Sequence, residues 1–295
     1  AIYSQAILSP PFSLRFMDEV PLTMVTLVRG EGWLVTAGGE RRRLRQWQTA
    51  VVRGGEPFEF TDDPDSVGVP ATEIHCIEDC DLENIDCYGN LLWGNNPDGE
   101  TALAVGAYRA EGTRHLRLLD ALPPVLVISE DSAGRGVLEE LMSEVASNRP
   151  GTQAVLDRLL DWGLVCTLRK WFDSADSQSP AWYRAHSDPA VGRALRAMHR
   201  APAANWTVAS LAAEARVSRA WLAKRFSELM GQSPLAYLTQ WRMTLAEDML
   251  AQPDATVASI AKRVGYSNAY AFSAAFKRIR GVSPARMARE LTPSM

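Results

Sequence analysis

The chain has 295 residues, 46% of them hydrophobic and 22% charged, which favours a folded protein of two domains over a disordered one. Its longest purely apolar run, residues 122–128, is too short to cross a membrane, and because no secretory signal opens the sequence we expect a cytoplasmic protein. The formal net charge of −4 conceals a division: residues 181–295 carry 16 Lys and Arg against 7 Asp and Glu, but residues 1–180 carry 15 against 28. A basic C-terminal part in an acidic chain indicates that this part meets a polyanion.

The first part of the chain has the pattern of short strands. Residues 22–28, 33–37, 49–53 and 102–108 are β-prone runs, and Gly, Asp and Pro turn signals separate them. Many short strands at this spacing predict an all-β barrel or jelly roll.

The hydrophobic period then changes from strands to helices. Residues 137–146 and 155–172 carry apolar side chains every three or four positions, and the polar stretch 173–180 follows as a linker. The helix over 155–172 is either a seam for a homodimer or a packing partner of its own β domain, and Cys166 on its apolar stripe is expected in the core. We predict an α+β protein with a β-barrel domain at 1–135, a helical interdomain segment at 136–180 and an all-α domain at 181–295.

An internal repeat dominates the C-terminal domain. The residues from Thr207 to Ala212 recur from Thr256 to Ala261, and Ser218 recurs as Ser267, all at an offset of 49. Later matches, such as Phe226 with Phe276, are offset by 50, so the second copy has gained one residue after its turn. Each copy has a small-residue helix, a tight turn, a Ser placed to cap the next helix and then an amphipathic helix, which is the layout of a helix-turn-helix unit.

The outward face of each second helix supplies the predicted DNA contacts. Arg and Lys there donate to guanine or to phosphate, and Asn pairs with adenine, whereas basic residues further along the helix position the protein on phosphates. Trp221 and Trp241 are expected to be packing residues rather than base contacts. The predicted DNA-binding residues are Ser218, Arg219, Ala220, Lys224, Arg225, Ser267, Asn268, Tyr270, Ser273, Lys277 and Arg278, with Arg280 expected among the phosphate contacts.

The region from about residue 188 to 291 resembles the AraC/XylS family of bacterial transcription regulators. The resemblance implies two helix-turn-helix subdomains joined by one long helix, here about residues 234–250, and two departures from the family pattern are Met287-Ala288 and Ala274. The matching residues are Leu211, Ala212, Ser218, Leu222, Arg225, Phe226, Gly231, Ser233, Pro234, Tyr237, Leu238, Arg242, Ala246, Leu250, Ile260, Ala261, Val264, Gly265, Tyr266, Phe272, Phe276, Lys277, Gly281, Ser283 and Pro284.

The N-terminal part is similar to the cupin-type ligand domain found in many members of that family. Residues 51–60, 106–108 and 118–124 carry this likeness. An enzymatic cupin needs a His and carboxylate cluster around a metal, but Phe58 stands where such cupins commonly place a His. We therefore expect no enzyme activity and no cofactor.

One cluster has no place in this scheme: His75, Cys76, Cys80 and Cys87. A metal site, a thiol redox switch and a variable loop with unpaired thiols are all open readings. The surrounding acidic residues would raise the pKa values of the thiols and favour a cation.

The sequence as a whole predicts a regulator that binds double-stranded promoter DNA, most simply as an activator. A small-molecule effector in the cupin-like domain would control it, and RNA polymerase and a second copy of the chain would be its further partners. The alternative is a redox- or metal-responsive regulator that uses Cys76, Cys80 and Cys87.

Overall fold

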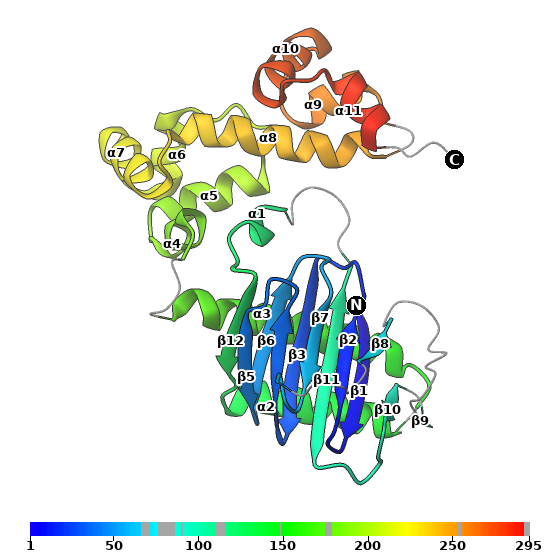
Figure 1. Cartoon of the computed structure of the whole chain (residues 1–295). Coiled ribbons are helices and arrows are strands. Elements are labelled where there is room, and N and C mark those ends of the chain that lie inside the picture. Colours follow the sequence, from blue (N-terminus) through cyan, green and yellow to red (C-terminus); the bar gives the residue numbers. More distant parts are fainter. Residues whose placement is uncertain are drawn as a thin grey trace. The chain divides into compact units, whose positions relative to one another are not determined.

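The chain divides into two compact units, a β-sandwich unit and a helical unit (Figure 1). The computed structural model describes residues 1–65, 71–75, 86–89, 91–109, 116–147, 149–174, 179–252 and 255–291. The sandwich unit comprises residues 1–110 and 122–177, and the helical unit comprises residues 111–121 and 178–295. Among the helices described, none combines the length and the apolar character that crossing a membrane requires.

Two sheets build the sandwich unit. The seven-stranded sheet has the order β12-β6-β3-β11-β1-β10-β9, and the five-stranded sheet has the order β5-β4-β7-β2-β8. The four runs predicted as strands fall in β3, β4, β6 and β11. The strands are β1 (Ile2–Leu8), β2 (Ser13–Phe16), β3 (Leu22–Arg29), β4 (Glu31–Thr36), β5 (Arg41–Arg45), β6 (Gln48–Arg53), β7 (Phe58–Thr61), β8 (Thr72–Ile74), β9 (Asp86–Gly89), β10 (Leu92–Gly94), β11 (Thr101–Tyr108) and β12 (Val125–Ser129).

One apolar core fills the space between the two sheets. Phe16 stacks on Phe58 with ring centroids 4.8 Å apart, and Phe12 stacks on Phe60 at 5.8 Å. These rings join buried aliphatic residues from both sheets, as the alternation of inward and outward side chains in a sandwich requires. The predicted barrel is therefore corrected in one respect: within the described residues the two sheets face each other and do not close into a single cylinder.

Helices α2 (Ser132–Ser147) and α3 (Thr152–Asp173) complete the sandwich unit. The Tyr108 hydroxyl on β11 donates a hydrogen bond to the Leu160 carbonyl at 2.9 Å, which ties α3 to the seven-stranded sheet. Of the two roles considered for the helix at 155–172, packing on its own β domain is thus observed for one face. Three large apolar side chains of α3 are nevertheless exposed, namely Val155, Trp162 and Val165.

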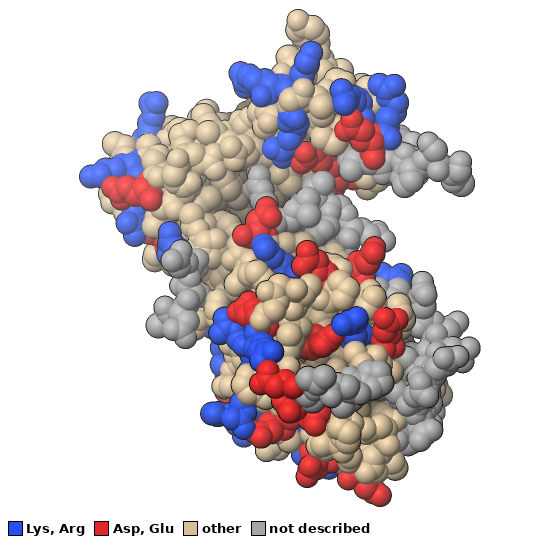
Figure 2. All heavy atoms as spheres, viewed as in Figure 1, with Lys and Arg blue, Asp and Glu red and all other residues tan. Residues whose placement is uncertain are grey.

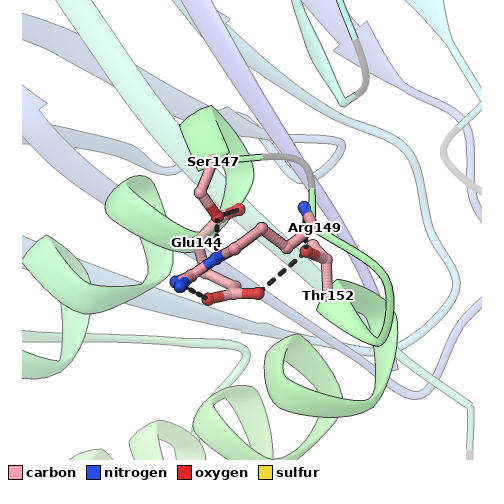
Figure 3. A network of polar contacts seen from close by, with 4 residues as sticks. All are labelled: Glu144, Ser147, Arg149 and Thr152. Atoms are coloured by element: carbon pink, nitrogen blue, oxygen red, sulfur yellow. Dashed lines mark hydrogen bonds and ion pairs between the residues drawn. The ribbon is translucent and has the colours of Figure 1, made fainter.

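A buried carboxylate closes the turn between these two helices (Figure 3). Glu144 near the end of α2 accepts a hydrogen bond from the Thr152 hydroxyl at 2.8 Å and pairs with Arg149 at 3.4 Å. The Ser147 hydroxyl donates to the Glu144 carbonyl, and the guanidinium of Arg149 donates to that hydroxyl in turn. Because Glu144 is only 7% exposed, these partners satisfy a charge that would otherwise be costly to bury.

Short helices build the helical unit around two separate apolar cores. In Figure 1 the long helix α8 (Pro234–Leu250) runs from α6 and α7 at one end to α9, α10 and α11 at the other. It contributes Tyr237 and Leu238 to the first core and Met243, Ala246 and Leu250 to the second. The predicted linking helix at 234–250 is confirmed to the residue. The other helices are α1 (Leu116–Leu119), α4 (Ala181–Ser187), α5 (Val191–Arg200), α6 (Val208–Ala215), α7 (Arg219–Met230), α9 (Val257–Arg263), α10 (Ala269–Arg280) and α11 (Pro284–Leu291).

Replacing Gly163 or Gly32 of the sandwich unit with Ala should shift the thermal midpoint of unfolding in opposite directions. A Cβ on Gly163, inside α3, would lie 3.8 Å from the Met24 methyl and 3.9 Å from Val137, which are ordinary contacts. Since Gly costs a helix interior about 1 kcal/mol relative to Ala, Gly163→Ala should raise the thermal midpoint of this unit. Gly32→Ala should lower the midpoint, because its Cβ would collide with the Cζ atom of the buried Phe60 ring. Calorimetric melting of both variants checks the pair, and equal shifts would contradict it.

Candidate nucleic-acid interface

The first helix-turn-helix unit consists of α6 and α7. Thr207 caps α6 in a reciprocal hydrogen-bonded pair with Ser210. The turn then places Arg216 in the left-handed region with φ 57°, and the Val217 amide donates to the Ala212 carbonyl at 3.0 Å. Ser218 caps α7 by accepting a hydrogen bond from the Trp221 amide at 3.2 Å, as predicted.

The second unit, α9 and α10, repeats this turn with a shifted cap. Gly265 takes the position of Arg216, with φ 84°, and the Tyr266 amide donates to the Ala261 carbonyl at 2.8 Å. The prediction that Ser267 caps the following helix is wrong, because the Asn268 side chain accepts the hydrogen bond from the Ala271 amide at 2.8 Å. The extra residue of the second copy moves the cap by one position, so Asn268 is the counterpart of Ser218.

The exposed face of α7 is basic and polar. Ser218, Arg219, Ala220 and Lys224 are all exposed, as their predicted role requires. Lys224 lies 3.9 Å from Glu228 on the same helix, and both side chains are largely in solvent, so this pair holds Lys224 only weakly.

Two residues of α7 differ from expectation. Trp221, expected to pack, is 45% exposed, whereas Trp241 packs beside the first core. Trp221 lines a surface groove together with Pro189, Ala190 and Lys224. Arg225 turns to Asp188, with its Nε 3.0 Å from the carboxylate.

The exposed face of α10 differs from that of α7. Tyr270 is 86% exposed, and Ser267, Asn268, Lys277 and Arg278 are exposed too. Ser273 is partly buried. Figure 2 shows Lys and Arg gathered over this end of the helical unit.

Arg280 does not belong with the phosphate contacts predicted for α10. Its guanidinium makes a two-pronged ion pair with Glu247 on α8, at 2.6 and 2.9 Å, and donates to the Thr244 hydroxyl at 3.1 Å. Glu247 is buried, so the pair joins the C-terminal end of α10 to α8. The sequence offers no local sign of this pairing, because the two residues lie 33 positions apart.

Arg242 on α8 joins the two helix-turn-helix units. Its guanidinium donates to the carbonyls of Pro202 and Ala204, at 2.7 and 2.8 Å, in the loop before α6. It also lies 6.0 Å from the centroid of the Tyr266 ring, which follows the second turn. Burial lowers the pKa of Arg242, yet a guanidinium remains charged at any physiological pH. One cation therefore fixes parts of both units, a role that the sequence analysis did not assign to it.

Most of the predicted cysteine cluster lies outside the described residues. Cys76 and Cys80 lie outside the described residues, as does the side chain of Cys87, whose backbone belongs to β9. His75 is described and exposed at the end of β8. Within the residues that the structure describes, no group of three or more His, Cys, Asp and Glu side chains is arranged to hold a metal. The redox or metal reading thus stays a prediction. Cys166, expected in the core, is only partly buried and lines a cavity.

Comparisons with known proteins agree with this architecture. A family model described as a cupin matches residues 1–173, and one described as a helix-turn-helix domain matches residues 211–290. An AraC-like transcription regulator of Streptomyces lividans is 38% identical over 191 residues, which are 63% of each chain, and one of Streptomyces antibioticus is 37% identical over 69% of this chain and 71% of its own. The HTH-type transcriptional regulator AlkR of Acinetobacter baylyi is 34% identical over 75% of this chain and 78% of its own.

A cupin domain followed by two capped helix-turn-helix units defines a DNA-binding transcription regulator. The chain belongs to the AraC family of transcription regulators. It spans 63% of the length of the Streptomyces lividans relative.

Asp188 provides a test of how α7 is held. Its carboxylate accepts hydrogen bonds from the Ala190 and Val191 amides and from Arg225. Burial alone would raise its pKa, but these bonds outweigh burial and hold the pKa below its ordinary value of 3.8. The stabilisation is therefore complete above pH 3.8 and is lost as the pH falls through the lower, folded-state pKa.

We expect Asp188→Asn to destabilise the helical unit by about 1–2 kcal/mol at pH 7, because the amide caps α5 but does not pair with Arg225. Urea unfolding followed by circular dichroism measures this, and the difference from wild type should shrink below pH 3.8. The exposed Glu214→Gln on α6 serves as the control. An unchanged urea midpoint for Asp188→Asn at pH 7 would show that the ion pair does not hold α7.

Gly265 tests the contact between the second turn and the loop before α6. A Cβ there would lie 2.6 Å from the Ala203 carbonyl and 2.8 Å from the Arg242 guanidinium, in a left-handed backbone conformation. Gly281→Ala is the control: Gly281 has φ 76° and open space around it, so the substitution introduces backbone strain without a steric clash. Gly265→Ala should therefore destabilise the unit by roughly 1–3 kcal/mol and by more than Gly281→Ala does in the same urea titration. Equal losses would mean that the contact contributes nothing.

Proposed function

We propose that this regulator reads promoter DNA with two recognition helices of unequal roles, α7 distinguishing bases and α10 mainly holding the backbone. The main support for these unequal roles is that Asn268 caps α10. Reading adenine requires both the Oδ1 and the Nδ2 atoms of an Asn. In Asn268 the Oδ1 accepts from the Ala271 amide at 2.8 Å, and the Nδ2 lies 3.3 Å from the Ser267 hydroxyl.

The remaining exposed residues support the same division. On α7, Arg219 and Lys224 are exposed beside Ala220, so long donors and a small apolar contact share one face. On α10 the corresponding face carries Ala274, and its exposed cations, Lys277 and Arg278, lie in the last turns of the helix. Cations at that position suit phosphates, which fix the register of a protein on DNA without specifying sequence.

We propose the further partners on other grounds. The exposed apolar residues Val155 and Val165 on α3 support a homodimer through that helix. A small-molecule effector in the cupin domain would control presentation of the helical unit, and the regulator would act in the cytoplasm as an activator in contact with RNA polymerase.

Two lysine variants of the full-length protein test the division of roles. Lys224→Ala should relax sequence preference, lowering discrimination at one base pair by about 1–3 kcal/mol. Lys277→Ala should weaken binding equally on all sequences and lower the slope of log affinity against log salt by about one unit. Selection from a random DNA library, followed by salt titrations on the selected site, measures both effects.

Arg41→Ala, an exposed cation on β5, is the matched control and should leave both quantities unchanged. The proposal fails if Lys277→Ala alters sequence preference and Lys224→Ala does not.

A further inference from the structure

The sandwich unit contains a cavity of about 580 Å³ outside the space between its sheets. One wall is the outer face of the seven-stranded sheet, at Met24, Thr26 and Thr49, and the others come from α2 and α3. This volume is in the range of small-molecule sites. The space between the two sheets is filled by the stacked phenylalanines and their neighbours.

Most of the cavity wall is apolar. Val137, Leu138 and Leu141 come from α2, and Trp162 and Cys166 come from α3. Trp162 is 55% exposed, and aromatic rings on the walls of such cavities bind apolar molecules by area and by stacking. The wall therefore suits a largely apolar ligand.

A buried polar relay lies in the inner wall. The Thr49 hydroxyl donates to Glu130 Oε1 at 2.6 Å, and the Thr26 hydroxyl lies 2.9 Å from the Thr49 oxygen. A hydroxyl has one proton to donate, so Thr49 accepts from Thr26 and the relay runs from Thr26 to Glu130. Glu130 is 9% exposed. This wall consequently offers acceptors, a carboxylate and the lone pairs of Thr26, to whatever occupies the cavity.

The charged residues at the cavity include a cation that already has a partner. Lys170 pairs with Asp131 at 3.2 Å, and Arg169 and Asp173 also line the cavity. Arg169 is exposed and Lys170 has Asp131 beside it, whereas Glu130 is buried, so Glu130 is the charged group that sets the preference for the head group of a ligand.

We infer that this cavity is the effector site, and that it takes an apolar molecule bearing one hydrogen-bond-donating head, an amine or a hydroxyl, which binds Glu130. The inference rests on the effector control proposed above. Helix α3 forms one wall of the cavity and precedes α4 in the chain. A ligand in the cavity therefore changes the packing of α3, the helix that comes before the DNA-binding unit.

Calorimetry on the full-length protein with three probes of one skeleton tests the head group. The probes are 4-phenylbutylamine, 4-phenylbutan-1-ol and 4-phenylbutanoate. The amine and the alcohol should bind with Kd values below about 10 mM, and the carboxylate should bind at least about tenfold more weakly because it faces Glu130. Carboxylate binding as tight as that of the amine, or the absence of amine binding, would overturn the inference.

Two variants and a matched control locate the binding. Glu130→Gln keeps an acceptor for Thr49 but loses the charge, so it should weaken the amine about tenfold and the alcohol by less. Gly163→Leu would place a bulky side chain in the cavity and should weaken binding of both. Glu139→Gln, an exposed residue of α2 outside the cavity lining, should change nothing. An unchanged amine Kd in Glu130→Gln would place the ligand elsewhere.

Protection of Cys166 from alkylation provides a second test of the site, which does not depend on whether Gly163→Leu folds. With Cys76, Cys80 and Cys87 replaced by Ser, the amine should slow alkylation of Cys166, and unchanged alkylation at saturating amine would overturn the site. Neither assay contains DNA, so failure of ligand binding and failure of DNA recognition are separate results. If the amine binds at Glu130 but leaves DNA affinity unchanged, the site stands and the proposed effector control fails.

Discussion

Helix α8 is the element on which the helical unit depends, because its residues belong to two apolar cores at once. Tyr237 and Leu238 complete the core around α6 and α7, and Met243, Ala246 and Leu250 complete the core around α9 and α10. Helix α8 has 17 residues and is therefore about 25 Å long. The separation of the two units is therefore set by packing on one rigid helix and not by a flexible tether.

Polar contacts from α8 fix the orientation that the apolar cores alone would leave adjustable. Arg242 bonds to two carbonyls before α6 and lies beside Tyr266 after the second turn, while Glu247 holds Arg280 at the end of α10. Such bonds between charged and carbonyl groups have strict geometry, and burial makes them costly to break. The same need for close approach explains why Gly265 occupies the second turn where the first has Arg216: the second turn packs against Ala203.

Much of this organisation could be predicted from the sequence, because repeats and helix-start motifs between neighbouring residues specify it. The repeat from Thr207 to Ala212 and from Thr256 to Ala261 marks both units, and Ser233-Pro234 marks the start of α8. The errors have a physical cause. The one-residue gain after the second turn transfers the cap from Ser267 to Asn268, and the partners of Arg225 and Arg280 lie 37 and 33 residues away, where no local period reports them. The cavity beside Glu130 was likewise beyond prediction, because its walls come from β3, β6, α2 and α3, which meet only in the folded unit.

If α8 is rigid, it holds the two recognition helices at one spacing and one rotational phase on DNA. The most direct measurement is ethylation interference on the selected DNA site, with and without five base pairs inserted between the segments contacted by α7 and by α10. Because α10 is proposed to contact phosphates and not bases, a rigid α8 predicts that the interfering phosphates stay at the same distance from the bases read by α7 in both duplexes. Interfering phosphates that move five base pairs further from those bases would contradict a rigid α8.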